Sequence, residues 1–267
     1  MCQPGKAVPG FQGVKRRDFY SGTNSLTARA AKTVSRVPNG TRIYAVGDIH
    51  GRADLLAQLF SRIDADLAAH HIERSIHVFL GDYVDRGPSS REVLDRLIDR
   101  AYSHESVFLM GNHELIFLQF LHDPAVLKQW RQYGGLDTLM SYGLKVPFNA
   151  NAEQLAALSA SLESVMPAEH CRFLEELKPS FECGSFFFAH AGVRPGVPLE
   201  NQRMDDLLWI REEFLQYEGG FGKIVVHGHT PAPEPEVRVN RINIDTGAYA
   251  TGRLTCLILE ADQRWFI

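Results

Sequence analysis

The stretch HVFLGDYVDRG, residues 77–87, joins a short apolar run to a charged turn. Residues 77–80 have the length and the apolar, partly aromatic content of a buried strand. Gly81 lets the backbone turn sharply, and Asp82, Asp85 and Arg86 follow at once. The stretch therefore predicts a strand that delivers charged side chains to the edge of a sheet.

The same rhythm extends outward from this stretch through most of the chain. Segments 54–69, 89–102 and 114–121 carry helical spacing. Strand, loop and helix repeated in this order predict an α/β domain. The other apolar runs expected to be strands are 43–46, 106–110, 185–188, 224–226, 241–244 and 254–259.

Two regions fall outside this rhythm. Residues 124–178 have mostly helical apolar spacing, and we expect a helical insertion between the two halves of the domain. Residues 1–40 are rich in Gly, Ser, Thr and basic residues without a clear period, so we expect a poorly ordered N-terminal extension before a domain at 41–267.

Composition limits the classes of protein to consider. With 267 residues and a net charge of -4, the chain has no global attraction to nucleic acid or to an anionic membrane. No apolar stretch approaches the roughly 20 residues of a membrane span.

Residues 15–19 faintly resemble a twin-arginine export signal, but the polar stretch 20–32 lacks the apolar region that would follow it. Four scattered cysteines fit reduced thiols, so we expect a cytoplasmic protein.

Groups that bind metals or phosphate follow five of the apolar runs. Each cluster alone is a weak signal, because Gly-Asp after a strand is usually a turn and a lone His is usually structural. Ligand sites of open α/β sheets lie outside the carboxyl ends of the strands, so we expect these clusters to meet. They are GDIHG at 47–51, GDYVDRG at 81–87, GNHE at 111–114, HAG at 190–192 and HGHT at 227–230.

The types of side chain in these clusters indicate a catalytic pair of transition metals. Carboxylate, imidazole and amide ligands suit Mn, Fe or Zn, whereas Mg or Ca prefer oxygen alone and structural Zn prefers thiolates. A carboxylate such as Asp82 has two oxygens and can bridge two ions. We expect two divalent metal ions, Mn in the first place, with Fe or Zn as alternatives.

These residues resemble the phosphoprotein phosphatase branch of the calcineurin-like metallophosphoesterases, whose signatures are GDxHG, GDxVDRG and GNHE followed by two histidines. The resemblance spans about 42–259. It implies a β-sandwich flanked by helices, in four layers α/β/β/α. It further implies that Asp48, His50 and Asp82 hold one metal, and that the second is held by Asp82, Asn112, His190 and His229.

The resemblance also implies roles in the reaction. His113 would be the general acid, paired with Asp85, and substrate phosphate would be bound by Arg86, Arg211 and Asn112. His227 and His229 compete for one ligand position, and the family pattern favours His229. Tyr249 lies where eukaryotic members carry a tyrosine loop, but the neighbouring sequence looks bacterial, and we assign no role to it.

The expected function is removal of phosphate from serine or threonine, or from tyrosine, of a phosphorylated protein or peptide by a metal-activated water. A symmetrical diadenosine tetraphosphatase or another small-molecule phosphoesterase is the alternative, although that tetraphosphatase usually has GDLVxRG and GNHD. A cyclic-nucleotide phosphodiesterase is disfavoured by Pro231, which stands where a Gly-His-x-His ligand would be. A noncatalytic phosphate-binding module is more remote, because no ligand position is lost.

Overall fold

The computed structural model describes residues 35–267. Most of the predicted extension at 1–40 therefore lies outside the described residues. The last part of that segment is packed: Val37 is buried, and its backbone N–H donates to the carbonyl of Ala261 at 2.9 Å. The packed part of the chain thus begins before the first strand.

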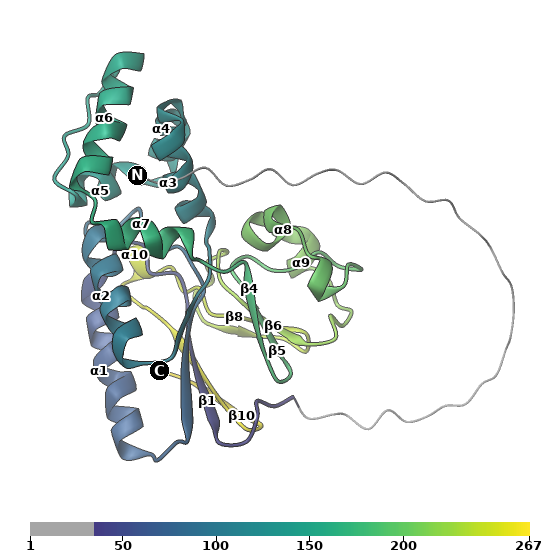
Figure 1. Ribbon diagram of the computed structural model, residues 1–267. Coiled ribbons are helices and arrows are strands. Elements are labelled where there is room, and N and C mark those ends of the chain that lie inside the picture. The colour runs from purple at the N-terminus through teal and green to yellow at the C-terminus, as the bar shows by residue number, and fades with distance from the viewer. Residues whose placement is uncertain (1–34) are drawn as a thin grey trace, which may run out of the picture. The chain divides into compact units, whose positions relative to one another are not determined.

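Ten strands form two five-stranded sheets (Figure 1). The first has the order β10-β9-β1-β2-β3, and β1, β2 and β3 run parallel. Its strands are β1 (Thr41–Val46), β2 (Arg74–Phe79), β3 (Ser106–Phe108), β9 (Cys256–Glu260) and β10 (Gln263–Phe266). The second has the order β4-β5-β6-β8-β7, with β5, β6 and β8 parallel. Its strands are β4 (Ser180–Cys183), β5 (Phe186–Ala189), β6 (Ile224–His227), β7 (Glu236–Val237) and β8 (Arg241–Asn243).

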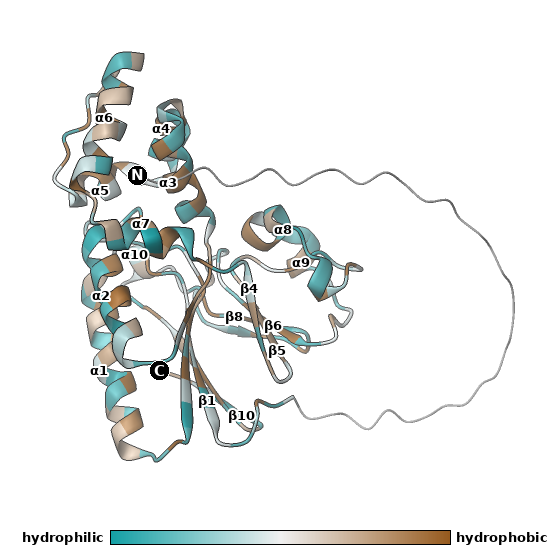
Figure 2. Cartoon of the chain, viewed as in Figure 1, coloured by the Kyte–Doolittle hydropathy of each residue, from teal (hydrophilic) through white to brown (hydrophobic). Residues whose placement is uncertain are grey.

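Alternation along β1 shows how the layers are built. Ile43 and Ala45 belong to the apolar core between the two sheets, whereas Tyr44 and Val46 belong to the core under the helices. Successive side chains of a strand point to opposite faces, so both faces of this sheet are buried. Figure 2 shows the brown, apolar segments concentrated along these strands and on parts of the helices.

Helices complete the outer layers. The first sheet shares its apolar core with α1 (Ala53–Ala69), α2 (Ser90–Ser103) and α3 (Asn112–His122). The second sheet packs against α8 (Met204–Trp209) and α9 (Glu212–Leu215) through a smaller core that contains Phe187, Leu207 and Phe214. Figure 1 shows these two helical layers on opposite sides of the sheets. The four-layer α/β/β/α sandwich expected from the resemblance is confirmed.

Residues 124–178 contain four helices above the strand ends of the first sheet (Figure 1). They are α4 (Leu127–Trp130), α5 (Gly135–Ser141), α6 (Ala152–Val165) and α7 (Ala168–Glu175), with 3₁₀ turns at Pro124–Val126 and Arg131–Tyr133. The region ends by pairing with the first sheet, because Lys178 forms a parallel bridge to Leu109. A further short helix, α10 (Ala248–Thr251), and a 3₁₀ turn at Leu199–Asn201 lie later in the chain.

All seven predicted strands are present, although their ends differ by a few residues. The sequence did not predict β4, β7 or β10. These three lie at sheet edges, where one side of a strand faces solvent and the apolar run is broken by residues such as Glu182 and Arg264. No helix in the described part of the chain is long and apolar enough to cross a membrane.

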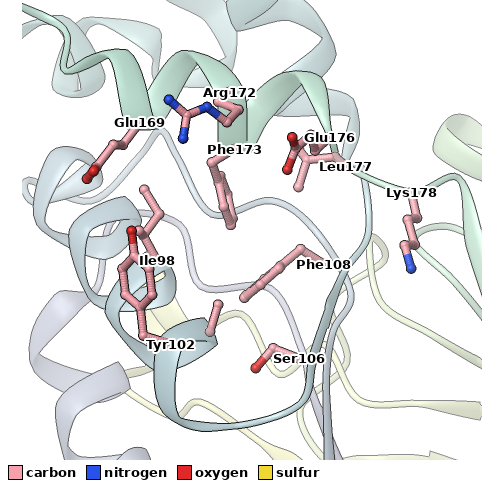
Figure 3. A pocket seen from close by; sticks show the side chains of 11 residues that line it. Ile98, Tyr102, Ser106, Phe108, Glu169, Arg172, Phe173, Glu176, Leu177 and Lys178 are labelled. Carbon is pink, nitrogen blue, oxygen red and sulfur yellow. The ribbon is translucent and has the colours of Figure 1, made fainter.

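A surface hollow of about 370 Å³ lies between α2, β3 and α7. Figure 3 shows Phe108 and Phe173 inside it and the charged side chains of Glu169 and Arg172 on the helix beside it. The two rings pack against each other with centroids 4.8 Å apart. None of the predicted site residues lines this hollow.

Candidate active site

The predicted ligand residues lie directly after strands of both sheets, where the two sheets approach closely. Asp48 follows β1, Asp82 follows β2, His190 follows β5 and His229 follows β6. A Cβ atom on Gly228 would lie 2.0 Å from the Asp48 carboxylate, so only glycine permits this contact. The glycine-containing turns thus bring side chains from different sheets into one buried cluster.

Backbone strain is concentrated at the same turns. The described residues include six non-glycine positions with positive φ, and five of them are predicted site residues. Such left-handed conformations are unfavourable for residues with a Cβ and persist where surrounding contacts enforce them. The five are His50, Asp82, Asp85, Arg86 and His229, with φ between 47° and 72°.

The first group of ligand atoms surrounds one oxygen of Asp82. His50 Nε2 lies 3.4 Å and His113 Nε2 lies 3.7 Å from Asp82 Oδ2. His50 is oriented by its other nitrogen, because Nδ1 lies 2.9 Å from the carbonyl oxygen of Val84 and can donate to it. His50, Asp82 and His113 are all buried, and their ligand atoms lie within 4.8 Å of one another.

The second group surrounds the other oxygen of the same carboxylate. His190 Nε2 lies 3.4 Å from Asp82 Oδ1, 2.9 Å from Asn112 Oδ1 and 3.1 Å from His229 Nδ1. Asp82 therefore presents one carboxylate oxygen to each of the two groups. Asp82, His190 and His229 also have their ligand atoms within 4.8 Å of one another.

Asp48 differs from the expectation in its immediate contacts. It does not belong to the tight group around His50; its carboxylate instead accepts the backbone N–H of His229 at 3.1 Å. It is buried, and burial together with the nearby Asp245 and Asp82 raises its pKa well above the usual range. A carboxylate surrounded by other acids in this way is stabilised by a cation.

The chemistry of the cluster fits divalent metals. Burial lowers the pKa of His50 to about 3 and that of His229 to about 2, so both imidazoles are neutral, the form that binds metal. His229 Nε2 is buried with no hydrogen-bond partner. A metal ion held by this cluster would offset the repulsion between the buried acids.

His113 and Asp85 form a hydrogen-bonded pair beside the cluster. His113 Nδ1 donates to Asp85 Oδ2 at 2.7 Å, and both side chains are buried. Burial lowers the pKa of His113, but the carboxylates of Asp82 and Asp85 outweigh it and raise this pKa above its ordinary value. The pair can therefore hold a proton near neutral pH, as a general acid requires.

Arg86 lies beside His113, at the imidazole nitrogen that does not contact Asp85. Its guanidinium nitrogen is 3.3 Å from His113 Nε2, and its Cζ lies 4.7 Å from the ring centroid of Tyr249. A guanidinium held over an aromatic face keeps its N–H groups free to bind oxyanions. Tyr249, to which the sequence assigned no role, is thus placed next to the predicted phosphate-binding group.

The remaining predicted residues are placed less uniformly. Arg211 is exposed and donates from Nη1 to the Thr230 hydroxyl at 3.1 Å, one residue beyond His229. His227 is buried outside the two ligand groups, where its Nδ1 lies 3.1 Å from the carbonyl of Gly228. The geometry therefore places His229, not His227, among the ligand atoms.

Two residues of the site were not predicted. Asp245 is buried near Asp48, and burial raises its pKa to about 6. The carboxylate of Glu114 accepts four backbone N–H groups from Gly111, Asp82, Tyr83 and Val84, at 2.7 to 3.2 Å. It thereby fixes the turn that carries Asp82. Asp245 follows the apolar run at 241–244, and that position was the available signal for it. The GNHE motif was the available signal for Glu114.

Comparison with known proteins supports the assignment of a family. A model of the calcineurin-like phosphoesterase family matches residues 41–262. Bis(5'-nucleosyl)-tetraphosphatase PrpE [asymmetrical] of Bacillus subtilis is 30% identical over 233 residues, which cover 79% of this chain and 87% of that protein. The protein of the same description from Anoxybacillus flavithermus is 26% identical, with coverage of 79% and 88%.

Solved structures share the fold. One crystal structure, of a protein described as a candidate diadenosine tetraphosphatase, has a TM-score of 0.58 and 20% identity, and the match covers 88% of this chain and 94% of that one. A mutant cold-active protein tyrosine phosphatase has a TM-score of 0.54 and 15% identity, with coverage of 90% and 82%. With the family match over most of its length, the chain belongs to the calcineurin-like phosphoesterase family.

Proposed function

We propose that the chain is a phosphoprotein phosphatase, which hydrolyses phosphate monoesters of serine and threonine side chains. The observation that carries this proposal is the His113–Asp85 pair, held at 2.7 Å beside the ligand cluster. An alkoxide is a much stronger base than a phenoxide or a nucleotide phosphate, so an alkyl phosphate gains most from a general acid at the leaving oxygen. The imidazole of His113, held in place by Asp85, therefore favours a substrate whose leaving oxygen must receive a proton.

The side chains divide the work of the reaction. Arg86 binds two oxygens of the phosphoryl group through its planar fork, which Tyr249 supports from below. His113 Nε2 faces Arg86 and Asp82, so it lies at the edge of the site where a leaving oxygen can receive its proton. Asp85 keeps the His113 ring oriented and favours its protonated form.

The ligand residues for metal would be Asp48, His50 and Asp82 for one ion, and Asp82, Asn112, His190 and His229 for the other. Two such ions, when bound, would lower the pKa of a bound water toward neutrality and so supply the nucleophile. We propose Mn as the metal, because mixed carboxylate and imidazole ligands suit it; Fe and Zn are the alternatives.

A second function, cleavage of dinucleoside tetraphosphates, is favoured by the description of the similar proteins as asymmetrical bis(5'-nucleosyl)-tetraphosphatases. Its leaving group is a nucleotide phosphate, which departs without strong protonation. A phosphatase of this second kind would therefore depend little on His113. The two functions thus make opposite demands on one residue.

We propose that the partner is a phosphorylated protein or peptide. We also propose that the protein acts in the cytoplasm. Within residues 35–267, Cys171, Cys183 and Cys256 form no disulfide with one another, which supports a reducing compartment. The acidic net charge of -4 gives no general attraction to nucleic acid or to anionic membrane surfaces.

The experiment that separates these functions compares kcat/KM on a phosphoseryl peptide, a phosphotyrosyl peptide and diadenosine tetraphosphate, with Mn²⁺ present. The proposal predicts the highest value for the phosphoseryl peptide. It also predicts a loss of about 10²-fold or more on that peptide in His113→Asn, with a much smaller loss on the dinucleotide. A dinucleotide preference that persists in His113→Asn would establish the second function instead.

A further inference from the structure

The carboxylate of Asp85 receives two hydrogen bonds from residues of the region 124–178, in addition to the one from His113. Trp130 Nε1 donates to Asp85 Oδ2 at 2.8 Å, and the Thr138 hydroxyl donates to Asp85 Oδ1 at 2.6 Å. Trp130 lies at the end of α4 and Thr138 lies in α5. Each oxygen of the carboxylate is therefore held by one side chain of the helical insertion.

Trp130, the first of these two donors, is held by tightly packed neighbours. Trp130 is fully buried and packs between Phe117 and Phe120 of α3, with centroids 5.3 Å and 5.2 Å away. A Cβ on Gly135 would lie 2.3 Å from the indole, so this glycine makes room for the ring. The indole N–H cannot turn away from Asp85 without repacking this core.

The hydroxyl network around Thr138 is complete. Its oxygen accepts the backbone N–H of Asp85 at 2.9 Å and lies 2.9 Å from the hydroxyl of Ser90, which can donate to it. With its own proton donated to Asp85, the Thr138 hydroxyl uses its donor and both acceptor positions. Such a network admits one orientation of the carboxylate.

The same segment also holds the backbone that follows Asp85. The carbonyl of Gly134 accepts the N–H of Arg86 at 3.2 Å. Both Asp85 and Arg86 have positive φ, 72° and 67°, a conformation that needs enforcement by contacts. Residues 130–138 thus clamp the turn that carries the partner of the general acid and the predicted phosphate-binding arginine.

We infer that Trp130 and Thr138 are positioning residues for the general acid: they lock the Asp85 carboxylate so that His113 presents Nε2 to the leaving oxygen. This inference rests on the proposed function, because it matters only where the leaving group needs a proton. The helical insertion then contributes directly to catalysis of alkyl phosphate hydrolysis, in addition to covering the strand ends.

The test measures kcat and KM of the metal-loaded full chain on a phosphoseryl peptide and on p-nitrophenyl phosphate, whose leaving group needs little protonation. Trp130→Phe retains the packed ring without its N–H, and Thr138→Val retains the shape without the hydroxyl. Each should lower kcat on the peptide about tenfold and kcat on the aryl ester less than about twofold, with KM unchanged.

Two matched variants separate positioning from general damage. Thr138→Ser retains the hydroxyl and should restore kcat on the peptide to within about twofold of the wild type. Ser159→Ala removes a buried hydroxyl of the same insertion, one that lies 3.3 Å from the Leu121 carbonyl and does not contact Asp85. It should leave the ratio of the two substrates unchanged.

A double-mutant cycle with His113→Asn gives the decisive outcome. Thr138→Val should cause no further loss on the peptide once His113 is absent. Equal losses on both substrates, or a loss that persists in His113→Asn, would show that Trp130 and Thr138 are only structural. If Trp130→Phe does not fold, the Thr138 series alone decides between these results.

Failure of the inference can be distinguished from failure of the proposed function. If His113→Asn alone slows both substrates equally, the general-acid role is wrong and the inference fails with it. If His113→Asn slows the peptide selectively while Trp130→Phe and Thr138→Val do not, only the positioning role is wrong.

Discussion

The two ends of strands β1 and β2 accommodate buried charge in opposite ways. At the end where the strands begin, Arg42 pairs with Asp66 at 2.7 Å and with Glu260, and the Tyr44 hydroxyl donates to Asp66 at 2.6 Å. Nearby, Arg100 pairs with Asp64 at 2.6 Å. Each of these acids has a cationic partner.

At the other end the acids gather without such partners. Asp48, Asp82 and Asp245 are buried together. Asp245 and Asp82 raise the pKa of Asp48, and Asp82 also raises the pKa of Asp245. His229 Nε2 has no hydrogen-bond partner. The comparison indicates that the paired charges of the first end stabilise the fold, whereas the clustered acids of the second end repel one another, which a cation would offset. Substitutions at the first end should affect stability, and those at the second should affect activity.

The largest effect is expected for His113→Asn. Loss of the general acid should lower kcat on a phosphoseryl peptide by about 10²- to 10⁴-fold, while the bound metal and the melting temperature change little. Steady-state kinetics, elemental analysis and calorimetry check these points. Retention of full activity on the alkyl ester would remove His113 from the mechanism.

Arg86→Ala should have the next largest effect on activity. Removal of a charged hydrogen bond to phosphate should raise KM and reduce kcat/KM by about 1.5–3 kcal/mol, roughly 10- to 150-fold. Arg96→Ala is the matched control, since its guanidinium pairs only with Glu92 on the exposed face of α2. Equal kinetics in the two variants would place the phosphate elsewhere.

His77, which is buried within β2 and outside both ligand groups, should make the stability of the fold depend on pH. Burial, and then Arg100 and His104, lower the pKa of His77 to about 3. The unfolded chain takes up a proton near pH 6.5, whereas the folded chain resists it, so stability is lost as the pH falls below about 6.5. Between pH 7 and 5 this group should reduce the free energy of unfolding by about 2 kcal/mol.

His77→Phe tests that contribution, because phenylalanine can replace the ring that packs edge-on against Tyr44. Urea unfolding at the two pH values should show the wild type losing about 2 kcal/mol more than the variant. Activity at pH 7 should be retained, since His77 packs against Tyr44 and His104 and belongs to neither ligand group. Identical pH dependence in both proteins would exclude His77 as the group responsible.

The smallest effect is expected for Asp66→Asn, which removes one partner of the nearly buried Arg42. Arg42 retains Glu260, so we expect a loss of about 1.5 kcal/mol in the free energy of unfolding without loss of turnover. The exposed pair is the control: Glu92→Gln should cost less than about 0.5 kcal/mol. If Glu92→Gln lost more free energy of unfolding than Asp66→Asn, the contrast between buried and exposed ion pairs would be contradicted.

Much of the fold and of the cluster could be predicted from the sequence because each signal was local. The apolar run at 77–80 ends in Gly81, and the charged residues after it lie at the carboxyl end of a strand, as the spacing predicted. The same reasoning brought His190 and His229 to Asp82 from the other sheet.

The contacts that could not be predicted depend on tertiary packing. Trp130 looked like an ordinary apolar position of a helix, and Thr138 carried no motif, yet both donate to Asp85. The pairing depends on how α4 and α5 fold back over the strand ends. The separation of Asp48 from the group around His50 and the burial of Asp245 likewise follow from the approach of two sheets, which no local pattern encodes.

The central claim is that Asp82 joins two metal-binding groups into one catalytic centre. Its most direct test is titration of metal-stripped protein with Mn²⁺, in which calorimetry measures bound ions and phosphoseryl peptide turnover is followed in parallel. Asp82→Asn is compared with Asp262→Asn, a carboxylate on the exposed turn before β10. The account predicts two ions per chain and metal-dependent turnover in the wild type and in Asp262→Asn, with both lost or sharply reduced in Asp82→Asn. Full turnover without metal, or wild-type behaviour of Asp82→Asn, would contradict it.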